Sequence, residues 1–327
     1  MIADKPVFGF GFDKYAVAHN NYQADYFAAN PEAKEEGELA DAVSYAFNEY
    51  IQIAAETGLV GLVLFLALGF LSFFKGNREQ NKNDSENYLL IAARGSLLAI
   101  LISAMFSYPF RSVPVNMFLL FVLAIISANY SHRIKELGFE EQKRRLLSII
   151  GIVILAFFTV NQVKKYKASK EWLEAFRLVR TREYKKAVTA YEDLYPILNY
   201  NQFFLFNYGA ELSVMGKYKK SVELLKEAEP RLNDADLYIY LGNSYVGLGD
   251  LKNAAHCFKK ASLIMPVKFY PKYRLVKVYL AMNEHEKALD LAREIVSMPV
   301  KIPSEIITSI RNEMQELVNN SYGLKSN

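Results

Sequence analysis

Two arginines stand where a basic side chain could bind phosphate. Arg94 interrupts an otherwise uncharged apolar run, residues 88–110, and Arg111 lies in the short turn that follows this run. A guanidinium group presents its N–H donors in a planar fork that matches phosphate oxygens. Arg94 could therefore hold a diphosphate, or its long stem could carry the charge to a membrane surface. Arg111 would lie where anionic lipid headgroups are found.

Residues that bind metals or nucleotides give weaker patterns. His256 and His285 lie in a helical region without a second ligand at metal-binding spacing, and Cys257 is the single cysteine. One cysteine forms no internal disulfide, so the redox compartment stays undecided. The segment from Gly9 to Gly11 is an isolated G-x-G without the strand and helix of a nucleotide site. We predict no metal and no cofactor.

The elements that would position the arginines are apolar helices. Hydrophobic residues form 52% of the 327-residue chain, and their long runs lie before residue 164. A helix needs about 20 apolar residues to cross a bilayer. Buried core helices of a soluble protein are the other interpretation, but the short polar connectors favour the membrane. We predict four transmembrane helices, at about 58–74, 88–110, 113–130 and 146–163.

Basic residues in the connectors predict an orientation. Lys and Arg are concentrated in 75–87 and 131–145, and positive loops face the cytoplasm. Residues 1–57 and 164–327 would then lie outside the cytoplasm, in the periplasm of a bacterium with two membranes. The sequence therefore predicts a multi-pass protein of the bacterial inner membrane, in contact with membrane lipid.

The remaining sequence repeats with a period near 34 residues. The clearest unit begins at Ala235, and its neighbours follow in the same phase. Small residues at two positions would let paired helices approach, and aromatic residues would fill the spaces between pairs. The pattern resembles the tetratricopeptide repeat (TPR). The residues that match are Tyr238, Leu241, Gly242, Tyr245, Ala254, Phe258, Ala261 and Pro266.

These patterns together predict an all-α protein in which transmembrane helices are followed by a TPR-like α-solenoid. The solenoid would cover 164–327 and end in a capping helix at 302–318, because the end of a stack needs one polar face. Such arrays bind other molecules, so we expect a protein or glycan partner. The net charge of +4 is too small to indicate nucleic acid.

Residues 1–57 carry a more specific pattern. A G-x-G segment opens this region, and a closing segment leads directly into the first apolar run. The arrangement resembles the carboxy-terminal part of the O-antigen ligase and polymerase family, over about residues 5–130. In that family the two segments bound a large periplasmic loop. The closing residues that match are Asn48, Glu49, Tyr50, Ile51, Gln52, Glu56, Gly58 and Gly61.

The resemblance implies metal-independent transfer of a lipid-linked glycan from undecaprenyl diphosphate to an acceptor hydroxyl at the periplasmic face. It places Asn48 near the acceptor and makes Glu49 or Glu56 a candidate base, although Glu49 could instead cap its helix. The family often has a histidine where this chain has Phe47, and His19 could take its place in space. The cations that hold the leaving diphosphate would be Arg111 and Arg94.

The same resemblance predicts that this chain is the later part of a longer protein, because family members have ten or more spans. Alone, such a fragment could lack activity. The alternative hypothesis is a non-catalytic, membrane-anchored TPR scaffold that recruits proteins of the cell envelope.

Overall fold

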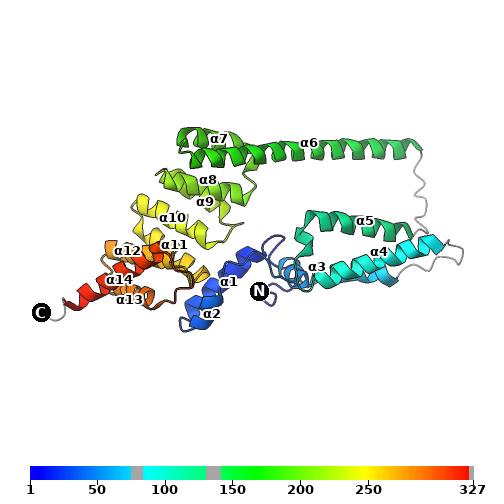
Figure 1. Ribbon diagram of the computed structural model, residues 1–327. Helices are drawn as coiled ribbons and strands as arrows, with labels where there is room; N and C mark the ends of the chain where they lie inside the picture. The colour runs from blue at the N-terminus through cyan, green and yellow to red at the C-terminus, as the bar shows by residue number, and fades with distance from the viewer. Residues whose placement is uncertain (75–83, 130–140, 324–327) are drawn as a thin grey trace. The chain divides into compact units, whose positions relative to one another are not determined.

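The computed structural model describes residues 1–74, 84–129 and 141–323, and every regular element in these ranges is helical (Figure 1). The all-α prediction is therefore confirmed for the described residues. The chain forms two compact units, which we describe separately. Unit 1 comprises Met1–Ala16 and Val43–Thr159, and unit 2 comprises Val17–Ala42 and Val160–Asn327.

Unit 1 contains the apolar helices. They are α3 (Glu49–Phe74), α4 (Asp84–Ser103), α5 (Val113–Asn129) and the first part of α6 (Glu141–Arg180), with a short 3₁₀ helix at Pro109–Arg111. Two of these helices pack against each other, because Ala93 and Leu97 of α4 contact Val122 and Ile126 of α5 in one small apolar cluster.

The predicted spans differ from the observed helices in length. Among the described residues, only Glu49–Phe73 and Arg145–Arg180 are long and apolar enough to cross a membrane. The predicted span at 88–110 is too long, because α4 ends at Ser103. The carbonyl group of the next residue, Ala104, accepts a hydrogen bond from the Glu49 amide (2.8 Å). The apolar stretches of α4 and α5 are shorter.

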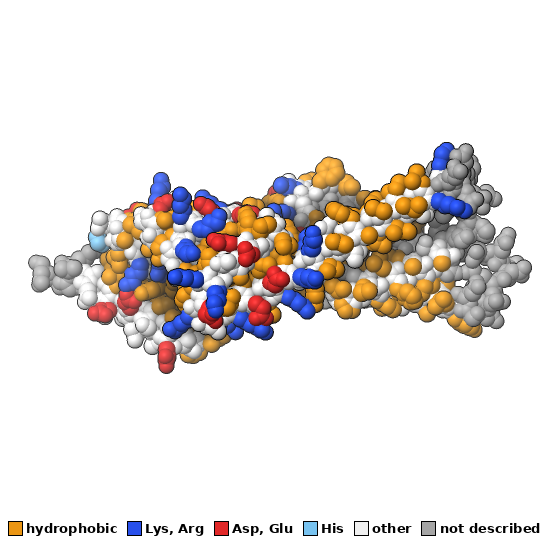
Figure 2. All heavy atoms as spheres, turned by 90° about the horizontal axis from the view of Figure 1, so that it is seen from above, with side chains coloured by type: hydrophobic (Ala, Val, Ile, Leu, Met, Phe, Trp, Pro, Cys, Tyr) orange, Lys and Arg blue, Asp and Glu red, His pale blue; other side chains and the backbone are white. Residues whose placement is uncertain are grey.

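Outside the cluster between α4 and α5, many large apolar side chains in unit 1 are exposed. Hydrophobic side chains follow one another along the exposed length of α6, whereas charged side chains gather over the repeat helices (Figure 2). Burying one such side chain contributes about 1.5–3 kcal/mol, so this surface is unfavourable in water. The large hydrophobic residues of α6 that are exposed before the end of unit 1 are Leu146, Leu147, Ile149, Ile150, Ile152, Val153, Ile154, Leu155, Phe157 and Phe158.

Unit 2 is a stack of helix pairs (Figure 1). Each pair packs internally and against the next pair, as the repeat prediction requires. The last part of α6 joins the same core through Ala168 and Ala175. The other helices are α7 (Tyr184–Leu198), α8 (Gln202–Val214), α9 (Tyr218–Ala228), α10 (Ala235–Gly247), α11 (Leu251–Ile264), α12 (Phe269–Ala281), α13 (His285–Ser297) and α14 (Glu305–Gly323).

The repeat residues occupy the places that their types suggest. Tyr238, Ala254 and Phe258 are buried in one continuous core. Gly242 is required by close approach, because a Cβ atom at this position would lie 2.7 Å from a ring carbon of Phe258. Cys257 is also buried, and burial raises the pKa of its thiol to about 12. The structure therefore confirms the TPR-like solenoid.

Two boundaries differ from those that the sequence suggests. Helix α6 runs without a break through residues 163 and 164, where the predicted membrane and repeat regions meet. The predicted loop 1–57 is divided, because Val17–Ala42 belongs to unit 2. This segment includes most of α1 (Tyr15–Ala29) and all of α2 (Lys34–Leu39). The basic connectors 75–87 and 131–145 lie largely outside the described residues.

Candidate functional site

The G-x-G segment and the closing segment of residues 1–57 meet at a break in α3. Gly58 adopts a left-handed conformation (φ 69°), and a Cβ atom there would lie 2.2 Å from the Val7 carbonyl oxygen. Residues 6–11 satisfy the backbone groups that the break exposes. The Phe10 amide donates to the Ala55 carbonyl group (2.9 Å), and the Leu59 amide donates to the Pro6 carbonyl group (2.7 Å).

Glu56 is buried two residues before the break. Its carboxylate accepts hydrogen bonds from the Asp13 amide (3.0 Å), the Tyr15 amide (3.3 Å) and the Gln52 side chain (3.3 Å). A carboxylate with its oxygen atoms engaged in this way is poorly placed to take a proton from a substrate. The geometry therefore favours a positioning role for Glu56.

Arg111 closes this polar cluster from the 3₁₀ helix. Its guanidinium group lies 3.0 Å from Asp13 and 3.8 Å from Glu56, and it stacks over the Tyr45 ring at 4.7 Å. The Tyr108 ring also stacks on the Tyr45 ring, with the two ring centroids 5.3 Å apart. The Arg111 side chain is 31% exposed and Asp13 is 51% exposed, so the outer ion pair faces solvent. An incoming anion would have to compete with Asp13 for the arginine.

Glu49 and Asn48 begin the same helix. Glu49 is buried and accepts one hydrogen bond, from the Phe110 amide (3.1 Å). Asn48 caps α3, because its side-chain oxygen accepts from the Ile51 amide (3.0 Å) while its nitrogen donates to the Met105 carbonyl group (2.9 Å). Of the two predicted bases, Glu49 has fewer hydrogen bonds than Glu56 among those the structure describes.

Two predicted site residues are not part of this cluster. His19 belongs to unit 2, where burial lowers the pKa of its imidazole. Arg94 lies in α4, and the ten positions to Ala104 correspond to about 15 Å along a helix. Asp13 and Tyr108 were not singled out, because single polar or aromatic residues in a loop carry no pattern. The described residues contain no group of three metal-binding side chains.

A second candidate site lies on the first helices of three successive repeats. Phe206 of α8 packs edge-to-face against Tyr240 of α10 (5.8 Å), and Tyr240 interacts electrostatically with Tyr270 of α12. We call these three residues the aromatic stripe. Burial, and then the carboxylates of Glu211 and Asp236, raise the pKa of Tyr240. Tyr270 is 38% exposed, so the stripe is accessible from solvent.

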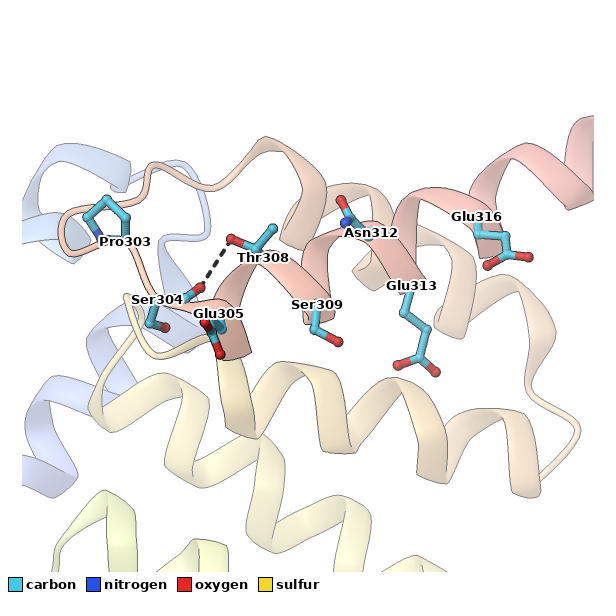
Figure 3. Close-up of a pocket in the computed structure, with 8 residues that line it drawn as sticks. All are labelled: Pro303, Ser304, Glu305, Thr308, Ser309, Asn312, Glu313 and Glu316. Atoms are coloured by element: carbon cyan, nitrogen blue, oxygen red, sulfur yellow. Dashed lines mark hydrogen bonds between the residues drawn. The ribbon is translucent and has the colours of Figure 1, made fainter.

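The outer face of α14 is polar and open (Figure 3). Figure 3 shows Ser309 and Glu313 extending from this helix in the same direction, and the Thr308 hydroxyl donates to the Ser304 carbonyl group (3.1 Å). Glu313 is already paired with Lys277. Since polar and acidic side chains on and just before a single helix line this hollow, we interpret it as a solvated face. Helix α14 occupies the position of the predicted cap.

No family model matches the chain. A curated protein, the TPR repeat-containing protein MJ0940 of Methanocaldococcus jannaschii, is 30% identical over 127 residues. The match covers 37% of this chain and 40% of that protein, so the chain spans less than half the length of this relative. The similarity supports the tetratricopeptide repeats. The resemblance to the O-antigen ligase family stays a prediction.

Solved repeat proteins are similar to part of the chain. MamA from Desulfovibrio magneticus RS-1 is 20% identical, with a TM-score of 0.38, over 39% of this chain and 72% of that one. Another MamA crystal structure is 19% identical, with a TM-score of 0.40, over 46% and 88%. YrrB, described as a TPR protein with an unusual peptide-binding site, is 16% identical, with a TM-score of 0.38, over 47% and 75%.

Proposed function

We propose that this chain is a TPR scaffold whose aromatic stripe binds a segment of another protein. The observation that carries the proposal is the edge-to-face contact of Phe206 with Tyr240, on the first helices of two successive repeats, together with the exposed Tyr270 on the first helix of the next repeat. Large aromatic side chains at a solvent-accessible surface are typical anchors of protein interfaces.

The partner segment would be apolar along one side. The stripe supplies ring edges and faces, and Phe203 extends it, since this residue lies three positions before Phe206 on the same helix face and is 54% exposed. Glu211 and Asp236 lie beside Tyr240, although Asp236 is paired with Lys268 (2.6 Å). This surface fits a segment with apolar anchors and a basic residue near Glu211.

Photo-crosslinking in cells tests the proposal. Benzoylphenylalanine replaces Tyr270 in the full chain, and the matched control replaces Tyr184, which is also exposed but lies on α7. We expect a light-dependent adduct from position 270 that is absent from position 184 and is reduced at least fivefold by Phe203→Ala. Equal adducts at both positions, or adducts that Phe203→Ala leaves unchanged, would contradict stripe binding.

We also propose that the apolar helices hold the scaffold at a bacterial inner membrane, with the array in the periplasm. The exposed apolar side chains of α6 support this membrane attachment, because lipid would surround side chains whose exposure to water is unfavourable. An alkaline phosphatase fusion after residue 165 should then be active, and a fusion within 75–87 should be inactive. The reverse pattern would overturn the orientation.

A second candidate function is the glycan transfer that the family resemblance implies. The meeting of residues 6–11 with the break at Gly58 supports it, because the two motif segments form one structure around Glu56 and Arg111. The donor would be a polyprenyl diphosphate-linked glycan. Losing a charge-assisted phosphate contact costs about 1.5–3 kcal/mol. Arg111→Ala should therefore reduce transfer roughly 10–150-fold.

Glycan ladders on gels would measure this effect at matched protein levels. Glu49→Gln should also lower transfer if Glu49 acts as the base, whereas Arg94→Lys, outside the cluster, should not. Wild-type ladders from both Arg111→Ala and Glu49→Gln would remove the ligase-like site from consideration and leave the scaffold.

A further inference from the structure

Residues 17–42, which we call the strap, run along one edge of the repeat array. The strap and the array exchange side-chain hydrogen bonds at the connection between α9 and α10. The Asn20 side chain donates to the Asn233 carbonyl group (2.7 Å), and the Asn233 side chain donates to the Val17 carbonyl group (3.0 Å). Asn20 is 3% exposed, so these bonds are sealed from water.

The strap reaches two further connections. The Gln23 side chain donates to the Ile264 carbonyl group (2.6 Å) where α11 leads to α12. A Cβ atom at Gly37 would lie 3.4 Å from the Cβ atom of Pro266 in the same connection. Lys301, between α13 and α14, donates to the Glu38 carbonyl group. The strap therefore contacts three successive inter-repeat connections.

These three connections have one feature in common. Each lies immediately before the first helix of a repeat or before the cap, that is, before α10, α12 or α14. Two of these helices present the aromatic stripe, through Tyr240 and Tyr270. Repeats in a solenoid contact only their neighbours, so the curvature of the array is open to change. A segment that bridges three connections would fix it.

We propose that the strap is an intramolecular brace that holds the starts of α10, α12 and α14 at a fixed spacing and so sets the geometry of the aromatic stripe. The effect on the aromatic stripe rests on the proposed function, whereas the bracing itself does not. The side chains of Asn20 and Gln23 donate to backbone carbonyl groups of the array, those of Asn233 and Ile264. These two bonds therefore fix the backbone of the connections directly.

The brace is only partly packed. A cavity of about 550 Å³ lies between the strap and the array, lined by Phe27, Gly37, Pro266, Leu275 and Met298 among other residues. Small side chains, Ala18 and Ala24, supply the buried apolar contacts of the strap. Because these buried apolar side chains are small, we expect hydrogen bonds to carry much of the attachment, so that removing two of them should release the strap.

Hydrogen exchange of the full chain in detergent tests the brace. In Asn20→Ala/Gln23→Ala, amides in the strap and in the first turns of α10 and α12 should exchange about tenfold faster. Helices α8 and α9, for which the structure describes no hydrogen bond to the strap, are the internal control. Equal exchange in wild type and variant at α10 and α12 would overturn the proposal, even if the strap itself were released.

A reversible lock gives a second, independent test. Gly37→Cys/Pro266→Cys, in a Cys257→Ser background, places two Cβ atoms close to the distance of a disulfide. Added to Asn20→Ala/Gln23→Ala, the oxidised lock should restore slow exchange, and reduction should reverse it. A disulfide that forms between two chains, or a lock that leaves exchange fast, would overturn an intramolecular brace.

Crosslinking from position 270 separates the brace from the stripe. If the brace sets stripe geometry, the adduct yield should fall about fivefold on strap release and recover on oxidation. A constant yield despite the exchange response would overturn the stripe clause and leave the brace standing. No adduct in any form would overturn the proposed function alone, since the exchange results do not depend on a partner.

Discussion

The two units of the chain place their apolar side chains in opposite ways. In the array, Phe204, Tyr208 and Phe258 are almost completely buried between helices. In unit 1, Leu64 of α3 and Phe121 of α5 are 65% and 63% exposed. Both regions are helical and rich in apolar residues, so helix content does not separate them. The two units differ in where those residues lie: in the array they are buried between helices, whereas in unit 1 many are exposed. This difference is what the proposal of a membrane-held scaffold explains.

The two units also differ in how they use glycine. Gly242 belongs to a repeated position where two helices approach, and Gly209 occupies the same position one repeat earlier. Gly58 occurs once, at a break where residues 6–11 supply the missing backbone partners. We therefore expect a substitution at Gly242 to destabilise the whole array. A substitution at Gly58 should disturb only the structure around the break.

The largest expected effect is at Gly242. Gly242→Leu would force a side chain into the ring of Phe258 and should destabilise the array by about 3 kcal/mol. This corresponds to roughly 6–12 °C in the melting temperature, followed by circular dichroism. Gly151→Ala is the matched control, since nothing lies within 4 Å of its added Cβ atom. An unchanged melting temperature for Gly242→Leu would contradict the close helix approach.

A smaller and local effect is expected at Gly58. A left-handed alanine costs about 1–2 kcal/mol, and its Cβ atom would also displace the Val7 carbonyl group. Gly58→Ala should therefore release residues 6–11 and speed chymotryptic cleavage after Phe8, which is exposed, while the melting of the array stays unchanged. Gly69→Ala in the same helix meets only ordinary contacts and is the control. Equal cleavage rates in the two variants would refute the proposed role of Gly58.

Ser244 tests the polar part of the array core. Its hydroxyl group is buried and bonds to Ser213 (2.8 Å) and Ser221 (2.9 Å), on two neighbouring helices. Ser244→Ala should cost about 1–2 kcal/mol, because it leaves buried hydroxyl groups with fewer partners. Ser169→Ala, at an exposed position, should be neutral. Chemical denaturation of both variants measures the difference, and equal stability would show that the network contributes nothing.

Periodic features of the fold are predictable from the sequence. The residues from Tyr238 to Ala261 match their repeat positions because each must fill a space that recurs along the stack. The end of α4 at Ser103 is not predictable from composition, since residues 104–110 are as apolar as the helix before them. At this end of α4, the amide group of Glu49, which is distant in sequence, donates a hydrogen bond to the carbonyl group of Ala104.

The candidate sites show the same limit. Glu56 and Gly58 are recognisable as motif residues, but their meeting with residues 6–11 depends on backbone bonds that leave no side-chain pattern. The attachment of the strap is not predictable from the sequence for a similar reason. Asn20 and Gln23 donate to main-chain carbonyl groups, which every residue type has, so no pair of matching side chains marks the contact. Long-range contacts of this kind require the three-dimensional structure.

The most direct test asks which medium surrounds α6. In a Cys257→Ser background, spin labels are attached to Ile154→Cys on the exposed apolar length and to Thr189→Cys on α7, and the chain is reconstituted into lipid vesicles. Oxygen concentrates in lipid, whereas a nickel chelate stays in water. We predict that position 154 is more accessible to oxygen and position 189 more accessible to the chelate. Equal, water-like access to the chelate at both positions would contradict the account of two units built for two media.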